Sequence, residues 1–358
     1  MYKRIVTIIG ARPQFIKSAP VSHALAAEGI QEYLLHTGQH YDYGMSQVFF
    51  DELGIQKPNI NLCVGSATHA EQTAEMLAGI EQVLQHEQPD GIIVYGDTNS
   101  TLAGALAAAK LRIPITHIEA GLRSYNKAMP EEINRVLTDH CAELLFCPTQ
   151  TAVSNLEKEG ITRGVHFVGD VMYDSALHYA EPASSRTHIL NEHRLTPGKY
   201  LLATIHRPYN TDDPSCLNSI LRALSELDET VILPVHPRMK QKIAQHGLLI
   251  KEFPDSNLIM IDPVSYLDML ILEKNSKMIL TDSGGVQKEA YFFGIPCLTL
   301  RTETEWIETL EGGWNRLVQV DSTSILHAVH QEIDYPPRPP VFGDGNASRL
   351  IADILSRS

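Results

Sequence analysis

The sequence predicts an α/β protein with two domains, each built on a parallel, doubly wound sheet. The chain has 358 residues, more than the about 100 to 200 residues of an ordinary domain, so two hydrophobic cores are expected. Short β-branched runs alternate with segments of helical periodicity, and this alternation starts again near residue 200. We expect the two domains to face a cleft that holds the functional site.

The first set of strands and helices lies before residue 170. Each predicted strand is an apolar run that ends in glycine, aspartate or proline and is followed by helical periodicity. The predicted strands are IVTIIG, YLLHTG, GIIVYGD, PITHIEAG and AELLFCP. The predicted helices start near Gln14, His69, Thr98, Glu131 and Thr149. Parallel strands with crossover helices produce this order.

The second set of elements begins near residue 200. Its predicted strands are YLLATIHR, TVILPVHP, NLIMID, KMILTDSGG and PCLTL, and a helix is predicted over residues 263–273. The polar stretch 171–199 contains EPASS and TPGK and is predicted as a linker that carries the hinge. The predicted domains therefore cover residues 1–170 and 171–342. After the helix-breaking run YPPRPP, a last helix within 343–358 is expected to join the first domain.

Composition favours a folded enzyme over a disordered chain, with 43% apolar and 20% charged residues. The formal net charge of -14 opposes binding to nucleic acid or an anionic membrane, but a small anionic substrate is allowed. The N-terminal run IVTII is too short for a signal peptide, and no run reaches the about 18 apolar residues of a membrane helix. The five cysteines form no CxxC pair. We expect a cytoplasmic protein without disulfides, metal or cofactor.

The turn after the first predicted strand, GARPQFIK, carries two cations. Arg12 and Lys17 stand at the carboxyl end of a strand and the start of a helix, where open α/β sheets bind ligands. This combination suits a diphosphate, and a pair of solvated surface charges is the alternative. The chain has no GxGxxG after this strand and no GxxxxGK[ST], GxSxG or DxD motif. Dinucleotide, P-loop, hydrolase and metal-diphosphate sites therefore lose support.

A glycine turn follows the strand KMILT in the second predicted domain. Gly284 and Gly285 allow backbone N–H groups after Ser283 to approach a phosphate, with help from the helix dipole. Glu289 comes about one helical turn later and is placed to accept the hydroxyls of a ribose. The motif SGG alone is common, but its position after an apolar strand favours a phosphate site.

Three carboxylates stand at strand or helix ends and are candidates for acid and base chemistry. Asp97 closes GIIVYGD, Glu119 closes PITHIEAG, and Glu131 follows Pro130 at a helix start. Structural alternatives exist. Asp97 has the sequence context of a helix cap, and Glu131 has the spacing for an ion pair with Arg135.

Two histidines end strands of the second predicted domain. His206 closes YLLATIHR and His236 lies in TVILPVHP, at the edge where a ligand is expected. A structural hydrogen bond is the alternative. A metal site is discounted because the sixteen histidines form no HExxH and no tight cluster with acidic residues.

Taken together and in order, six motifs resemble the non-hydrolysing UDP-N-acetylglucosamine (UDP-GlcNAc) 2-epimerases over nearly the whole chain. The motifs are GARPQFIK, YGDTNSTLAG, HIEAGLRS, MPEEINR, HRP and LTDSGGVQKEA. The resemblance implies a GT-B architecture of two Rossmann-like domains, with UDP held mainly by the C-terminal domain and the sugar by the N-terminal one. It also implies a homodimer.

The resemblance further implies functional residues by matched position. The catalytic candidates are Asp97, Glu119, Glu131 and His206. The substrate and UDP contacts are expected at Arg12, Lys17, Arg135, His236, Tyr266, Ser283, Gly284, Gly285 and Glu289. The hydrogen on carbon 2 has no adjacent carbonyl to acidify it, so the implied route eliminates UDP to a 2-acetamidoglucal and adds it back after reprotonation. Which carboxylate removes the proton stays open.

Several positions depart from the UDP-GlcNAc pattern. Gln14 replaces the usual Glu, Pro208-Tyr209 replaces Arg-Glu, and Trp306 replaces an Arg that contacts ligand. The run Gln39-His40-Tyr41-Asp42 and Ser66 differ from the residues that hold an activating second UDP-GlcNAc, so weak or no allosteric activation is predicted. GARPQFIK, TGQHYDYGMS and TEW look more like the branch acting on UDP-2,3-diacetamido-2,3-dideoxy-glucuronate in surface polysaccharide synthesis. Either sugar remains a candidate.

Three rival functions fit parts of this sequence. A GT-B glycosyltransferase shares the predicted fold, but it needs one base and an acceptor groove instead of three carboxylates. A hydrolysing 2-epimerase would release UDP. A nucleotide-sugar-binding regulator would be expected to lose the carboxylates, which are all present here. The sequence therefore favours the non-hydrolysing epimerase.

Overall fold

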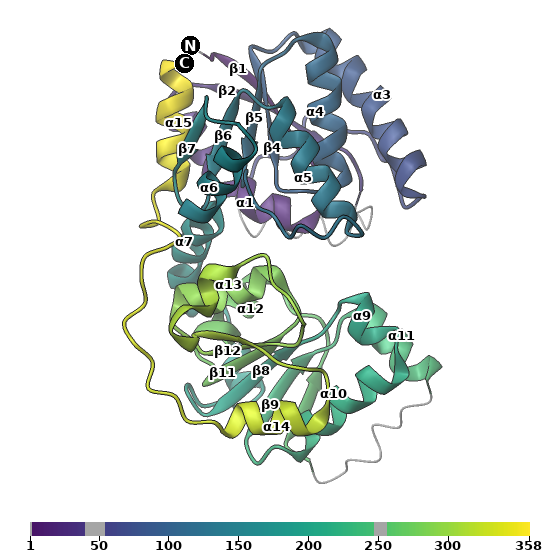
Figure 1. The fold of residues 1–358 in the computed structure, drawn as a ribbon, viewed down its shortest axis with the longest axis vertical. Coiled ribbons are helices and arrows are strands. Elements are labelled where there is room, and N and C mark those ends of the chain that lie inside the picture. Colours follow the sequence, from purple (N-terminus) through teal and green to yellow (C-terminus); the bar gives the residue numbers. More distant parts are fainter. Residues whose placement is uncertain (1, 40–53, 247–255) are drawn as a thin grey trace. The chain divides into compact units, whose positions relative to one another are not determined.

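A computed structural model describes residues 2–39, 54–246 and 256–358 of the chain (Figure 1). The chain divides into two compact units. The first unit comprises Met1–His178 and Pro340–Ser358, and the second comprises Tyr179–Pro339. Each unit contains one parallel sheet with helices, so the predicted α/β class with two parallel sheets is confirmed.

The first sheet is built from short apolar strands. They are β1 (Arg4–Ile9), β2 (Gln31–His36), β3 (Ile60–Asn61), β4 (Gly91–Tyr95), β5 (Ile115–Ile118), β6 (Leu144–Cys147) and β7 (Val165–Phe167). Their order is β3-β2-β1-β4-β5-β6-β7, and neighbouring strands run parallel. The central strands are continuous apolar runs because helices cover both of their faces.

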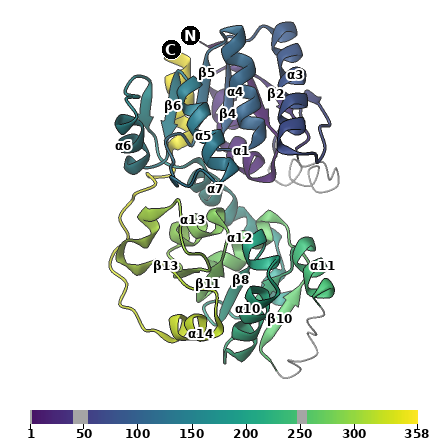
Figure 2. The same ribbon diagram turned by 45° about the vertical axis from the view of Figure 1, so that its right-hand side comes forward.

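The first unit holds the helices α1 (Arg12–Ala27), α3 (His69–Glu87), α4 (Asn99–Leu111), α5 (Pro130–Cys141), α6 (Gln150–Lys158) and α15 (Ala347–Arg357). Figures 1 and 2 show α3, α4 and α5 side by side on one face of the sheet, and α1 with α15 on the other. Thr98 and Thr149, two of the predicted helix starts, are the N-caps of α4 and α6.

The second unit repeats the plan. Its strands are β8 (Tyr200–Thr204), β9 (Thr230–Pro234), β10 (Leu258–Ile261), β11 (Met278–Thr281), β12 (Cys297–Thr299) and β13 (Asn315–Leu317), in the order β10-β9-β8-β11-β12-β13. Its helices are α8 (Ile189–Glu192), α9 (Pro208–Thr211), α10 (Pro214–Glu226), α11 (Pro237–Gln245), α12 (Tyr266–Lys274), α13 (Gly284–Phe293), α14 (Ser322–His330) and the 3-10 helix η2 (Ile307–Gly313). A separate hydrophobic core fills each unit.

Each sheet has a topological switch point. The chain moves outward from β1 to β3 and then returns to β4 on the other side of β1, and it does the same around β8 and β11. Ligands of open α/β sheets bind outside the carboxyl ends of the strands at this point. The first turns of α1, which follows β1, carry the predicted cations, and the loop after β4 carries Asp97. His206 follows β8, and the SGG turn leads from β11 into α13. The sequence motifs therefore fall at both switch points.

The predicted linker over residues 171–199 is wrong for most of its length, because α7 (Val171–Arg186) and α8 occupy it. EPASS lies inside α7, and Pro182 is accommodated there. Met172, Ala176, Tyr179 and Ala183 are buried at helical spacing, which outweighs the polar residues between them. The two compact units divide within α7, after His178. The short edge strands β3, β7 and β13 carry too few residues to show a period and were not predicted.

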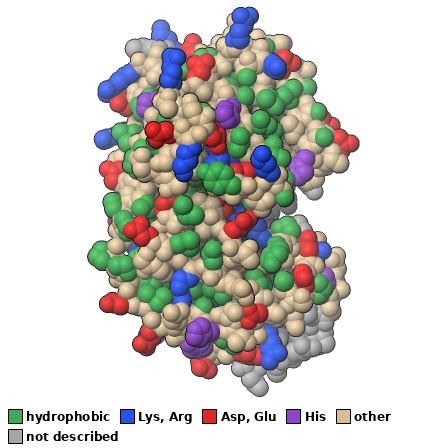
Figure 3. Space-filling model, viewed as in Figure 1, with side chains coloured by type: hydrophobic (Ala, Val, Ile, Leu, Met, Phe, Trp, Pro, Cys, Tyr) green, Lys and Arg blue, Asp and Glu red, His purple; other side chains and the backbone are tan. Residues whose placement is uncertain are grey.

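The surface drawn in Figure 3 intersperses Lys and Arg side chains with Asp and Glu side chains, without a broad basic patch on that face. Within residues 2–39, 54–246 and 256–358, none of the helices combines the length and the hydropathy needed to span a bilayer. The predictions on His40–Asp42 concern residues outside the described ranges.

Candidate active site

A buried ion pair lies at the carboxyl edge of the first sheet. Lys17 comes from the second turn of α1, and Glu119 follows the last residue of β5. Their side chains form an ion pair, with only 9% of Lys17 and 6% of Glu119 exposed. The fold therefore brings together two predicted site residues that belong to separate sequence motifs. Buried charges of this kind are stable only as a pair.

The backbone of Glu119 has an unusual conformation. Its φ is +71°, a left-handed value that costs energy for a residue with a side chain. The N–H groups of Glu119 and Ala120 both donate to the carbonyl of Phe146, at 3.1 Å each, and hold the chain in this turn. Strained backbone of this type is concentrated at functional sites.

Asp97 is fixed by residues of α5. Its carboxylate accepts from Nη2 of Arg135 at 2.5 Å, and its carbonyl accepts from the side-chain amide of Asn134 at 2.9 Å. Arg135 also donates from Nη1 to Glu132 at 3.0 Å. The guanidinium fork thus bridges two carboxylates, and the carboxylate of Asp97 keeps about a third of its surface open to solvent.

Glu131 and Glu132, neighbours in the first turn of α5, have different surroundings. Glu131 is partly exposed and makes no ion pair among the described residues, so the expected alternative of a bridge to Arg135 is not found. Glu132 is buried and accepts from the backbone N–H groups of Ser124 and Tyr125, at 2.9 and 2.8 Å. The sequence analysis did not single out Glu132. The only available signal was that two consecutive acidic residues in one helical turn point in different directions, so that one of them could be buried.

Gln14 joins the two loops of the first switch point. Its side-chain oxygen accepts from the N–H groups of Gly10 and Ala11, and its amide donates to the carbonyl of Tyr95 at 2.9 Å. The same amide reaches the hydroxyl of Thr98 at 3.1 Å. An amide serves here as donor and acceptor at once, which is the physical reason for Gln at this position.

Asp282 organises the switch point of the second sheet. It is fully buried and accepts from the backbone N–H groups of His206 and Arg207, at 3.1 and 3.0 Å, and from the side-chain amide of Asn210 at 3.0 Å. The ring of His206 lies 6.1 Å from the ring of His236. The two predicted histidines are therefore neighbours. The role of Asp282 was not predicted, because an aspartate before SGG also fits a plain turn.

The SGG turn forms the start of α13. Ser283 is the N-cap, its hydroxyl accepting from the N–H of Val286 at 3.5 Å, and Gly284 is the first helical residue. A side chain on Gly284 would have its Cβ only 2.5 Å from Oε1 of Glu305. Glu305 is held by Arg301, at 3.0 Å. A side chain at this position would therefore displace the carboxylate of Glu305. The helix N-terminus presents backbone N–H groups.

A cluster of buried acids lies behind this helix start. Glu289 of α13 and Tyr266 of α12 are both almost fully buried and lie near each other. Burial and the negative charge of Glu289 raise the pKa of Tyr266 well above its usual value. Glu273 of α12 is fully buried beside Glu289, and burial followed by the charge of Glu289 raises the pKa of Glu273 strongly. Burial beside a second carboxyl group therefore favours the protonated, neutral form of Glu273.

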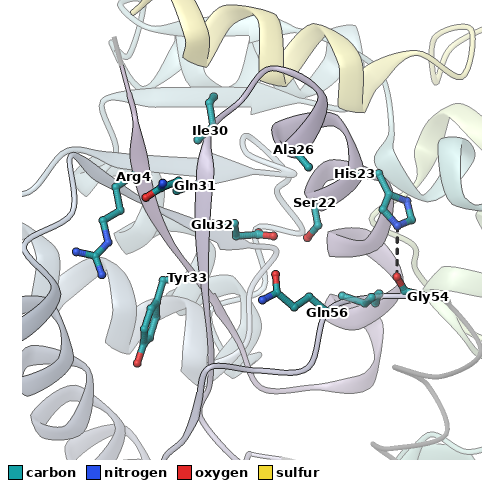
Figure 4. Close-up of a pocket in the computed structure, with 11 residues that line it drawn as sticks. Arg4, Ser22, His23, Ala26, Ile30, Gln31, Glu32, Tyr33, Gly54 and Gln56 are labelled. Atoms are coloured by element: carbon teal, nitrogen blue, oxygen red, sulfur yellow. Dashed lines mark hydrogen bonds between the residues drawn. The ribbon is translucent and has the colours of Figure 1, made fainter.

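A cavity of about 520 Å³ lies away from both switch points (Figure 4). It is lined by the amino-terminal half of β2 and by α1, with Ser22, Glu32 and Gln56 on one side and Arg4 and Tyr33 on the other. None of the predicted functional residues lines it.

In the part of the chain that the structure describes, no group of three or more His, Cys, Asp or Glu side chains is arranged to hold a metal ion.

Carboxylates and cations lie at the carboxyl edge of the first sheet, and a glycine-rich helix N-terminus suited to a phosphate lies at the switch point of the second. Together with the fold, these two groups of residues define an α/β enzyme of the GT-B type. The family model described as UDP-N-acetylglucosamine 2-epimerase matches residues 23–356. The chain belongs to this family and is an isomerase of the epimerase type. The resemblance found in the sequence motifs is thereby confirmed.

Relatives match the chain along its whole length. A UDP-N-acetylglucosamine 2-epimerase homolog of Methanococcus maripaludis is 51% identical, over 98% of this chain and 99% of the relative. The UDP-2,3-diacetamido-2,3-dideoxy-D-glucuronate 2-epimerase of Pseudomonas aeruginosa is 47% identical, over 99% of both chains. The crystal structure of Methanocaldococcus jannaschii UDP-GlcNAc 2-epimerase in complex with UDP-GlcNAc and UDP is similar with a TM-score of 0.90 and 41% identity, over 99% of this chain and 100% of that chain.

Proposed function

We propose that this chain inverts carbon 2 of a UDP-linked acetamido sugar while UDP remains part of the product. The observation that carries this function is the pairing of cations with carboxylates at the switch point of the first sheet, together with an anion-binding helix start at the switch point of the second. Both sets belong to a chain of the epimerase family.

The first unit supplies proton transfer at the sugar. Glu119, Asp97 and Glu131 are the candidate acids and bases, and Lys17 keeps Glu119 charged and oriented through their ion pair. Arg135 orients Asp97 through the fork that it shares with Glu132. In this proposal Arg135 acts on the carboxylate and not directly on the substrate.

The second unit supplies the nucleotide site. The N-terminus of α13, with Ser283, Gly284 and Gly285, binds the diphosphate, and His206 and His236 donate to its oxygens. Arg12, at the start of α1 in the first unit, is proposed as a further contact to the substrate. Glu289 accepts the ribose hydroxyls, and Tyr266 packs near the uridine, with the buried acid Glu273 beside Glu289.

The proposed reaction avoids direct deprotonation of carbon 2, whose hydrogen is only weakly acidic. A base removes its proton while the bond between the anomeric carbon and oxygen breaks, and UDP leaves with the electron pair. The product of this step is a 2-acetamidoglucal with a double bond between carbons 1 and 2. A second group returns a proton on the opposite face and UDP adds back, which gives the epimer. Cations and helix N–H groups stabilise the charge on the departing diphosphate.

Of the two candidate sugars, UDP-2,3-diacetamido-2,3-dideoxy-glucuronate is the preferred substrate in this proposal. The relative from Pseudomonas aeruginosa named for this sugar is 47% identical, whereas the UDP-GlcNAc 2-epimerases of Methanococcus maripaludis and Methanocaldococcus jannaschii are 43% and 41% identical. The motifs with Gln14 and Trp306 point the same way. UDP-GlcNAc is the second candidate, favoured by the structural match to the complex that contains it.

Three further features belong to the same proposal. The chain acts as a homodimer in the cytoplasm, where UDP-sugars are made, and its product feeds surface polysaccharide synthesis. The absence of a membrane-spanning helix among the described residues is compatible with that location.

Proton NMR of the purified protein with each UDP-sugar separately tests this function. The expected result is the anomeric signal of the manno epimer with the diacetamido-glucuronate, and a weaker or absent signal with UDP-GlcNAc. Turnover of UDP-GlcNAc alone reverses the substrate preference. No epimer with either sugar, while UDP still binds, contradicts the function.

A further inference from the structure

A buried histidine lies directly behind the candidate carboxylates. His117 is the third residue of β5, is fully buried and stands two residues before Glu119. Its Nδ1 atom lies 2.6 Å from Oδ1 of Asp139 in α5, and its Nε2 atom lies 2.7 Å from the carbonyl oxygen of Gly96. Both ring nitrogens therefore contact an oxygen atom at short hydrogen-bond distance.

The partners of His117 define its protonation state. Asp139 accepts from the N–H of Gly121 at 3.1 Å and from Nη1 of Arg123 at 2.6 Å, as an ionised carboxylate does. Burial acts to raise the pKa of Asp139, but His117 and Arg123 outweigh it, and the pKa lies below its usual value. A carboxylate and a backbone carbonyl only accept hydrogen bonds, so both ring nitrogens of His117 must donate. These are the contacts that a doubly protonated ring makes.

The charges around the ring compensate one another. Arg123 donates from Nε and Nη2 to Glu159, at 2.7 and 2.8 Å, so the chain of groups His117, Asp139, Arg123 and Glu159 alternates in sign. The thiol of Cys147 on β6 also faces Asp139, and burial followed by that carboxylate raises the pKa of Cys147. The thiol stays neutral and adds no charge. A buried cation in an alternating network of this kind is electrostatically supported.

The hydrogen bond from His117 acts on the turn that carries Asp97. Gly96 has a φ of +61°, and its N–H donates to the backbone of β5 at 3.0 Å, so β5 holds both polar groups of this residue. A side chain on Gly96 would place its Cβ 3.4 Å from Nζ of Lys17 and from Oε2 of Glu119. The turn therefore lies against the ion pair and fixes the position of the backbone from which Asp97 extends.

We propose that His117 is a positioning residue that stays an imidazolium during turnover and locks the Gly96 turn, and through it Asp97, beside the Lys17–Glu119 pair. This role rests on the proposed function of those carboxylates. A neutral imidazole carries one N–H, so it would release either Asp139 or Gly96 and turn a lone pair toward an oxygen atom. Releasing Gly96 frees the backbone that aims Asp97.

The protonation state is tested on the wild-type protein by nitrogen-15 NMR of labelled histidines between about pH 6 and about pH 9, either side of the unperturbed His range. Correlations from the assigned backbone of the wild-type protein identify the signals of His117. Two slowly exchanging ring protons that persist across this range are expected. A single ring proton, or a second proton that titrates away near neutrality, overturns the proposal. This measurement uses the wild-type ring and stands even where a variant of His117 folds poorly.

The positioning role is tested by kinetics of His117→Gln, with His166→Gln as the matched control. His166 lies on β7 of the same sheet, packs against the ring of Phe146, and is not one of the candidate catalytic residues. We expect kcat of His117→Gln to fall about 100-fold with KM and UDP affinity changed less than about threefold, and the control to match wild type. Full turnover of a folded His117→Gln overturns the role. A wild-type protein without activity on either sugar contradicts the proposed function instead, and the ring-proton count then tests the imidazolium alone.

Discussion

The ammonium of Lys17 and the carboxylate of Glu119 form an ion pair across 102 residues of sequence. Both side chains are nearly excluded from solvent, with Lys17 on α1 and Glu119 directly after β5. A carboxylate in this setting stays charged only because its cation is present. The pair therefore couples the first motif of the chain to the proposed chemistry at carbon 2.

Replacing Glu119 with Gln should lower turnover far more than UDP affinity. The amide keeps the shape of the side chain but cannot take or give the proton, so we expect kcat to fall by about 100-fold or more. The dissociation constant of UDP, measured by calorimetry, should change less than about twofold, since UDP contacts are proposed in the second unit. The exposed Glu143 is a matched control, and Glu143→Gln should keep wild-type kinetics. Undiminished turnover of Glu119→Gln would remove this residue from the mechanism.

Replacing Lys17 with Met should destabilise the fold through the charge left behind. An uncompensated buried carboxylate costs about 3 kcal/mol or more of unfolding free energy. The double variant Lys17→Met with Glu119→Gln lacks that charge and should recover most of the loss. Unfolding free energies of the wild type, both single variants and the double variant, measured by urea denaturation, give the coupling energy between Lys17 and Glu119. Additive single effects would argue against an energetically coupled pair.

Replacing Glu273 with Gln should raise stability increasingly with pH. The native pKa of Glu273 lies well above its unfolded value of about 4.3, so wild type loses stability as pH rises from the unfolded value toward the native one. Gln does not titrate, so the difference in unfolding free energy should grow by about 1.4 kcal/mol per pH unit in this window. Denaturation at about pH 5, 6 and 7 measures it. A difference independent of pH would mean that Glu273 is ionised in the native protein.

Replacing Gly284 with Ala should weaken UDP binding. The added Cβ would stand 2.5 Å from Oε1 of Glu305, so either that carboxylate, which accepts a hydrogen bond from Arg301, or the start of α13 must shift. We expect at least about a tenfold loss of UDP affinity, or about 1.4 kcal/mol. The double variant Gly284→Ala with Glu305→Ala lacks the clash. Any UDP affinity that the double variant has lost relative to Glu305→Ala alone is then due to the added methyl group beside the diphosphate. Wild-type affinity of the single variant would place the nucleotide elsewhere.

Most strands and helices were predictable because each signal is local. Apolar β-branched runs gave the central strands, and Thr98 and Thr149 marked helix starts through side-chain caps. The polar segment EPASS was misjudged as linker because most of the apolar residues of α7 that are buried at helical spacing lie before the segment. The short edge strands left no period to detect.

The functional site was predictable only where a residue type carries chemistry by itself. Carboxylates and cations after strands identified Lys17 and Glu119, but their pairing depends on the sheet order and was not visible in the sequence. Glu132, Asp282 and Asp139 were missed for the same reason: their importance comes from hydrogen bonds to distant backbone groups and cations. A local pattern does not encode such partners.

The most direct test of the account is isotope incorporation during turnover in deuterated water, followed by proton NMR and mass spectrometry of the product. Elimination and re-addition of UDP predict an epimer that carries deuterium at carbon 2 and still carries UDP. An epimer without deuterium at carbon 2 would contradict proton removal at that carbon, and free sugar with free UDP would contradict the non-hydrolysing reaction.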